Sequence, residues 1–194
     1  CALLNSQPMG FYAPAQIVRD AREHGVEVRP VCINSSFWDN VMEADGRGGL
    51  ALRLGFRQVK GLREEEALWI PAARANGYRA VADLWRRAGI APRMLAQLAE
   101  ADAFHALGLN RREALWEAKA VGGDKPLPLF AGDMDGEAIT EPKVLLPQMT
   151  LGEEIVEDYV ATRLTLRTHP VALLRHILTP GIAPVKTVSR TQGE

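Results

Sequence analysis

The sequence has few residues that could crosslink the chain or hold a metal ion. Cysteine occurs only twice in 194 residues, as Cys1 and Cys32. Two thiols cannot build a disulfide framework or a cysteine-based metal site, so we interpret them as incidental thiols of a reducing compartment. Scattered positions of the four histidines favour surface or packing roles over catalysis. They are His24, His105, His169 and His176.

Long apolar runs and a strong net charge are also missing. No run approaches the ~20 residues of a membrane span, and no basic-then-apolar signal peptide opens the chain. We therefore expect a cytoplasmic protein that makes no membrane contact. The net charge of −1 excludes a uniformly basic nucleic-acid binder, so charge has to be analysed by segment. The chain opens on Cys1, inside an expected helix, which indicates a piece of a longer protein.

The first 49 residues carry helix and strand signals. "YAPAQIVRDAREHG" predicts a helix with Pro14 in its first turn and Gly25 just after its end. "VEVRPV" predicts a short strand, at a sheet edge because of Pro30. Alternating leucines in "LALRLGF" predict a β-hairpin around "ADGRGG".

Residues 50–123 change to a helical pattern, so the expected fold class is mainly α with a small β-hairpin. Apolar residues recur on helical faces, and Gly77, Gly89 and Gly108 divide the segment into short helices. Asn110 is a predicted N-cap. Residues 124–150 are acidic and rich in Pro and Gly, which predicts a linker. Residues 151–194 predict short helices that lead to a missing domain.

The helical segment contains an internal repeat. "VKGLREEEALWI" and "RAGIAPRMLAQL" each predict a helix, a tight glycine turn and a second helix. The matched pairs, all 28 residues apart, are Gly61 with Gly89, Leu62 with Ile90, Ala67 with Leu95, and Ile70 with Leu98.

A glycine turn beside a helix N-terminus is a natural anion site. Glycine permits positive φ and close approach of another backbone. Successive N–H groups and the helix dipole then favour a phosphate. The alternative, which spacing leaves open, is a helical hairpin with a glycine C-cap and no ligand.

The charge distribution favours the phosphate interpretation. Residues 50–123 hold twelve basic and eight acidic residues, a net charge of +4. Residues 124–158 hold two basic and nine acidic residues, a net charge of −7. A basic unit with paired backbone anion sites suits the sugar–phosphate backbone without sequence readout. Simple solvation of an arginine-rich surface stays open as the alternative.

These residues resemble a known family. The "GL" and "GI" turns look like a tandem helix-hairpin-helix motif. "LLNSQPMGFYAPAQIVRDAREHGVEVRPVCIN" resembles the end of the fingers region of bacterial C-family DNA polymerases, the polymerase III alpha-subunit-like proteins. "LALRLGFRQVKGLREEEALWI" resembles the hairpin strand and first motif that follow, and "LTLRTHPVALLR" resembles the segment before an OB fold. These stretches most resemble the error-prone branch of the family, which acts in damage-induced translesion synthesis.

The resemblance implies non-sequence-specific binding of duplex DNA by a fragment without catalytic residues, metal or cofactor. The carboxylates that hold Mg²⁺ would lie upstream, in the palm of a parent DNA-directed DNA polymerase. The residues predicted to contact DNA are Lys60, Gly61, Leu62, Arg63, Arg86, Arg87, Gly89, Ile90 and Arg93.

The two turns differ from each other. Arg63 stands where the family pattern usually has a second glycine, and arginine enters the left-handed region at greater cost. Glu64, Glu65 and Glu66 suit the helix dipole but repel phosphate. The Gly89 turn has arginines before and after it instead. We therefore predict that the second turn is the better phosphate binder.

A second candidate site is "KPLPLF". Leu127, Leu129 and Phe130 resemble the sliding-clamp-binding peptide of bacterial polymerases, although Pro126 stands where the usual glutamine would be. Such anchors insert into preformed grooves, or they fold back as a satellite cluster. The alternative function is therefore a protein-interaction module that docks the sliding clamp or a mutagenesis partner through residues 124–158. A free-standing repair enzyme is disfavoured because no reactive constellation stands out.

Overall fold

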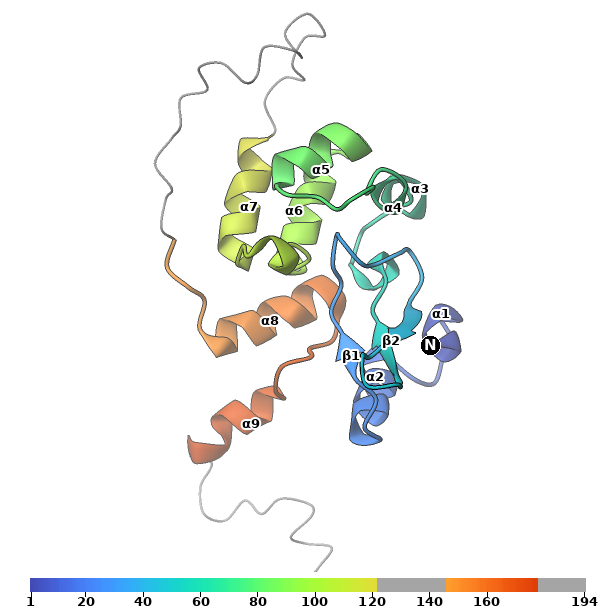
Figure 1. The fold of residues 1–194 in the computed structure, drawn as a ribbon. Coiled ribbons are helices and arrows are strands. Elements are labelled where there is room, and N and C mark those ends of the chain that lie inside the picture. Colours follow the sequence, from blue (N-terminus) through green and yellow to red (C-terminus); the bar gives the residue numbers. More distant parts are fainter. Residues whose placement is uncertain (122–145, 178–194) are drawn as a thin grey trace, which may run out of the picture.

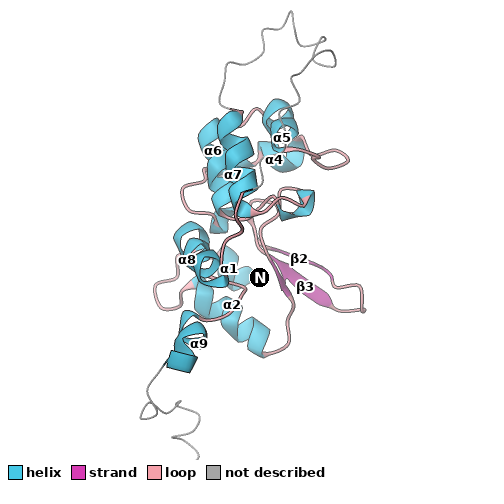
Figure 2. Ribbon diagram, turned by 90° about the vertical axis from the view of Figure 1, so that its left-hand side faces the viewer, coloured by secondary structure: helices cyan, strands magenta, loops and turns pink. Residues whose placement is uncertain are grey.

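The structure, a computed structural model, describes residues 1–121 and 146–177. Its helices and strands follow one another along the chain and are separated by short connections (Figures 1 and 2). In order they are α1 (Ala2–Asn5), α2 (Pro14–Glu23), β1 (Val28–Arg29), β2 (Val41–Ala44), β3 (Leu50–Arg53), the 3-10 helix η1 (Phe56–Gln58), α3 (Glu64–Ala67), α4 (Trp69–Ala72), α5 (Val81–Ala88), α6 (Pro92–Glu100), η2 (His105–Leu107), α7 (Arg111–Ala120), α8 (Leu151–Thr162), α9 (Pro170–Leu174) and η4 (Arg175–Ile177).

The N-terminal part confirms the predicted helix, edge strand and hairpin. Pro14 opens α2, and Gly25 follows its end with a φ of +82°. The sheet order is β1-β3-β2, with β2 antiparallel and β1 parallel to the central β3. The carboxylate of Asp45 accepts the amide hydrogens of Arg47 and Gly49, which closes the hairpin turn.

One side chain of the hairpin does not follow the predicted alternation. Leu50 is 60% exposed, whereas Ala51 and Leu52 are both buried. Leu50 pairs with Ala44 at the turn end of the hairpin, beyond the reach of the core. Ala51 and Leu52 lie further along β3, where the strand is covered on both faces.

The helical segment is divided as predicted. Gly77, Gly89 and Gly108 all have positive φ. Gly89 and Gly108 end helical stretches, whereas Gly77 lies in the loop between α4 and α5. The side chain of Asn110 accepts the amide hydrogen of Glu113 and caps α7. Helices α5, α6 and α7 pack together at one end of the molecule (Figure 1).

A single buried cluster runs through the described part of the chain. It includes Leu4 of α1, Leu52 of the sheet, Leu95 of α6 and Leu164 after α8. The packed unit therefore extends beyond the helical segment, although the predicted boundaries of the four segments stay predictions.

Helix α8 is held against α7 by buried charges. Arg111, whose side chain is 4% exposed, donates to Glu154 and Asp158, at 2.6 Å in each case. Arg167 also pairs with Asp158 at 2.8 Å and with Asp102 at 3.0 Å. Burial is the largest single influence on the pKa of Arg167 and lowers it, but Asp158, Asp102 and Glu154 together outweigh burial and raise the pKa of the guanidinium. This cluster fixes the segment after residue 146 to the helical unit.

Candidate nucleic-acid interface

The two glycine turns of the repeat adopt the same backbone path. Gly61 and Gly89 have φ values of +80° and +63°. Each is followed by a buried apolar residue, Leu62 or Ile90, and then by an extended residue that caps the next helix. Leu62 and Ile90 therefore anchor their turns in the core, and the parts exposed to a ligand are backbone groups.

The second turn connects the more regular pair of helices. It joins α5, with eight residues, to α6, with nine. The first turn follows the three residues of η1 and leads into α3 and α4, which are four residues each. Pro71 accounts for that division, because it has no N–H to bond the carbonyl of Ala67.

The second turn presents free backbone donors. The amide of Gly89 is bonded to the carbonyl of Trp85. The amides of Ile90, Ala91 and Arg93 donate to no acceptor among the residues that the structure describes. They lie at the N-terminus of α6, where the helix dipole favours an anion.

The space around the second turn is open. A Cβ placed on Gly89 would meet no atom within 4 Å. A phosphate oxygen can therefore approach the backbone at this position without displacing a side chain.

The first turn is covered by its neighbours. The amide of Lys60 donates to the carbonyl of Ala161, at the end of α8, over 2.8 Å. A Cβ on Gly61 would lie 2.6 Å from Nε2 of Gln97, which belongs to α6. Gly61 is thus favoured by its positive φ, and a side chain there would only have to displace the flexible amide end of Gln97.

The arginines predicted to contact DNA have different environments. Arg86 and Arg93 are exposed, and neither side chain has a hydrogen bond or ion pair within residues 1–121 and 146–177. Lys60 is exposed as well. Arg63 is 77% exposed and makes a 3.8 Å contact with Glu66, which contributes little at the surface.

Arg87 is occupied by the protein itself. Its guanidinium donates to the carbonyls of Ala73 and Gly77 and forms a 3.1 Å ion pair with Asp83. The same group lies 4.7 Å from the ring centre of Tyr78. Arg87 therefore holds the loop between α4 and α5 against α5.

A second arginine, absent from the predicted set, supports the same loop. Arg74 donates from Nε to the carbonyl of Ile33 over 2.9 Å and lies over the ring of Phe37. Burial lowers the pKa of Arg74 and raises the pKa of Tyr78, whose hydroxyl donates to the carbonyl of Ile70. Sequence reasoning missed Arg74 because its partners lie about forty positions away along the chain.

Another candidate reactive group in the described part of the chain, the thiol of Cys32, is buried. Burial is the largest single influence on Cys32 and opposes its ionisation, but hydrogen bonds with His105, Asn34 and Ser35 and the charge of His105 together lower the pKa of the thiol. Cys32 is only 2% exposed, so reagents have little access to it.

No three metal-ligating side chains gather in the described part of the chain. No helix described here is long and apolar enough to cross a membrane. The predicted clamp-binding residues Leu127, Leu129 and Phe130 lie outside the described residues.

Comparisons with known proteins agree with this geometry. A family described as the helix-hairpin-helix motif matches residues 25–114, which include both turns. An error-prone DNA polymerase of Ruegeria pomeroyi is 63% identical over 184 residues, covering 95% of this chain. Error-prone DNA polymerase 2 of Rhizobium meliloti is 59% identical over 182 residues, and its namesake in Agrobacterium fabrum is 57% identical over 185.

The chain is therefore similar to one segment of proteins named error-prone DNA polymerase. It spans 17% of the length of these relatives. The predicted recognition is confirmed, as is the fold class of a mainly α unit with a small sheet and helix-hairpin-helix motifs. The assignment of individual residues to DNA contact stays a prediction.

Proposed function

We propose that this polymerase segment holds duplex DNA by its sugar–phosphate backbone, chiefly through the Gly89 turn. The observation that carries the proposal is the open turn, whose unpaired amides lie at the N-terminus of α6 beside Arg93. Backbone amides and arginines that contact phosphate position a protein on DNA without reading the base sequence. Binding without sequence preference follows from this chemistry.

The Gly61 turn is proposed to serve mainly as a structural hairpin. Its neighbours Gln97 and Ala161 occupy two sides of it. Glu64 and Glu65 are exposed at the start of α3, where they repel phosphate. Both properties favour a lesser DNA contact than at the Gly89 turn.

The proposed setting is a parent DNA-directed DNA polymerase that acts in damage-induced translesion synthesis. Within the described residues, the side chains do not fit a catalytic metal, because no suitable group of ligands is present. The proposal gives this segment a DNA-binding role and leaves nucleotide transfer to the parent enzyme. The Mg²⁺ of the parent enzyme is proposed to lie elsewhere, in its palm.

Docking of a sliding clamp or mutagenesis partner through residues 124–158 is the weaker proposal. Residues 122–145 lie outside the described part of the structure. In the described remainder, Glu154 and Asp158 are already paired with Arg111. These acids serve the intramolecular contact of α8, which leaves fewer charges for a partner.

The test compares Arg93→Glu with Glu65→Ala in a duplex-binding assay at low salt. We expect the Arg93 variant to bind about tenfold more weakly, because a cation beside the phosphate becomes an anion. Glu65→Ala should change affinity by less than about threefold, since its turn makes the lesser contact. Equal binding by the wild-type chain and the Arg93 variant would refute the proposal.

A further inference from the structure

A cleft of about 520 Å³ lies between α2 and the end of α8. One wall comes from α2, with Gln16, Arg19, Arg22 and the carboxylate of Glu23. The other comes from Tyr159 of α8 and from Thr168 and His169, just before α9. Figures 1 and 2 show α2 and α9 at the opposite end of the molecule from α5 and α6. The cleft is therefore separate from the Gly89 turn.

The cleft has positive charge that the protein does not neutralise. Arg22 is exposed, and its side chain has no hydrogen bond or ion pair in the described ranges. Arg19 has only a 3.9 Å contact with Glu23, with both side chains more than 60% exposed, so the pair is weak. By contrast, the guanidinium of Arg167 forms ion pairs with Asp158 and Glu154. The two arginines of α2 thus remain available to an anion.

The opposite wall supplies a ring nitrogen donor and an aromatic surface. Nδ1 of His169 accepts the amide hydrogen of Val171, which leaves Nε2 as the ring nitrogen that can donate to a ligand. Tyr159 is 37% exposed, which leaves part of its ring open to a stacked base. Hydroxyl and amide groups of Thr168 and Gln16 add further polar partners.

We propose that this cleft binds one nucleotide unit of single-stranded DNA. Its phosphate lies between Arg19 and Arg22, and its base stacks on Tyr159. Positive grooves with aromatic stacking surfaces are typical of single-strand binding. A duplex keeps its bases paired inside, so it cannot stack one of them on Tyr159. The proposal rests on the proposed function only in taking DNA as the ligand.

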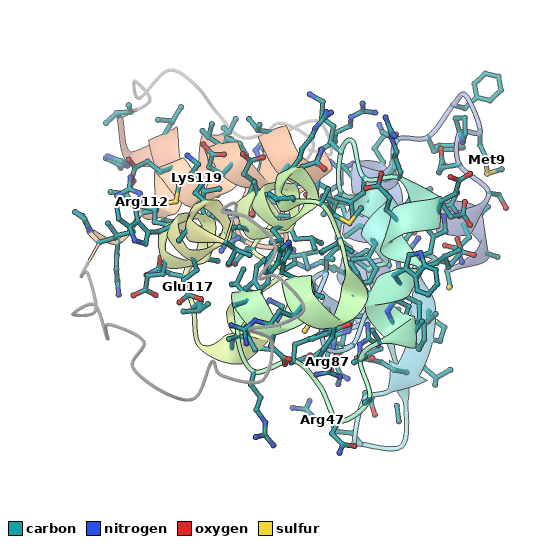
Figure 3. All side chains as sticks on the ribbon, turned by 90° about the horizontal axis from the view of Figure 1, so that it is seen from above. Met9, Arg47, Arg87, Arg112, Glu117 and Lys119 are labelled. Carbon is teal, nitrogen blue, oxygen red and sulfur yellow. The ribbon has the colours of Figure 1, made fainter. Side chains whose placement is uncertain are left out.

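The test measures anisotropy of a labelled twelve-nucleotide oligo(dT) with the 194-residue chain and its Arg22→Glu variant. We expect about tenfold weaker binding, and a dependence of log K on log salt that is shallower by about 0.7, because one phosphate contact is lost. The matched control is Arg47→Glu, the same charge change in the β2–β3 turn, which lies across the molecule from α8 (Figure 3). It should change affinity by less than about twofold.

Two further measurements separate this site from the Gly89 turn. Arg22→Glu should leave duplex affinity nearly unchanged, and Arg93→Glu should leave oligo(dT) affinity nearly unchanged. Tyr159→Ala should weaken oligo(dT) binding about tenfold but not the binding of an abasic strand of equal length. Equal losses in the Arg22 and Arg47 variants, or no oligo(dT) binding at low salt, would overturn the cleft proposal. Failure of Arg93→Glu to affect duplex would instead count against the proposed function.

Discussion

At the scale of single residues, Arg87 shows how one side chain can have two plausible roles. By its position two residues before Gly89, it belongs to the predicted DNA-contacting set. In the structure its guanidinium donates to backbone carbonyls of Ala73 and Gly77, pairs with Asp83 and lies over Tyr78. These contacts satisfy carbonyls near the end of α4, and water replaces them poorly in a packed loop. Arg87 therefore stabilises the loop that precedes α5.

Replacing this side chain tests the role directly. We expect Arg87→Ala to lower the free energy of unfolding by about 2 kcal/mol, because several charge-assisted hydrogen bonds are lost together. In a chain of this size that corresponds to a fall in Tm of about 4–8 °C. Arg86→Ala, at the exposed neighbouring position, should stay within about 0.5 kcal/mol of the wild type. Equal effects of the two variants in thermal and urea unfolding would contradict the assignment.

At the scale of elements, local signals predicted the features that depend on nearby residues. Gly89 and Gly108 ended their helical stretches with positive φ, Asn110 capped α7, and Gly61 and Gly89 both formed turns with positive φ. The glycine pattern was sufficient to predict the turn at Gly89. The surroundings of that residue are open, so its own backbone decides the geometry of the turn.

Features that depend on distant partners were not predicted. The first turn is covered because Gln97 and Ala161 reach it from α6 and α8. The carboxylate partners of Arg111 lie 43 and 47 positions away along the chain, and no local sequence pattern predicts such ion pairs. The cleft lined by Arg22 likewise brings together α2 and residues near α9. Tertiary packing alone determines these contacts, so periodicity and composition could not reveal them.

At the scale of the whole molecule, the buried charges around Arg111 join α8 to the helical unit. The side chains of Arg111 and Asp158 are 4% and 10% exposed. Removal of one partner from such a buried group leaves an uncompensated charge, which is costly. The attachment also brings Ala161 to the amide of Lys60, so it helps to define which of the two turns stays open.

The attachment can be tested by removing its central cation. We expect Arg111→Ala to destabilise the chain by about 3 kcal/mol and to speed amide hydrogen exchange in α8 more than in α5 and α6. Arg112→Ala is the matched control, since its ion pair with Glu153 is 36% and 48% exposed and should contribute less than about 1 kcal/mol. Unchanged exchange in α8 of the Arg111 variant would mean that apolar packing alone holds the helix.

The central claim is that the Gly89 turn holds the phosphate backbone of duplex DNA. A salt-titrated duplex-binding assay of the wild-type chain, Gly61→Ala and Gly89→Ala tests it most directly. We predict a slope of log K against log salt of about −2 or steeper for the wild-type chain, as expected for two or more neutralised phosphates. Gly89→Ala should bind about tenfold more weakly and Gly61→Ala less than about threefold more weakly, with circular dichroism confirming that both are folded. A slope near zero, or a larger loss at Gly61 than at Gly89, would contradict the account.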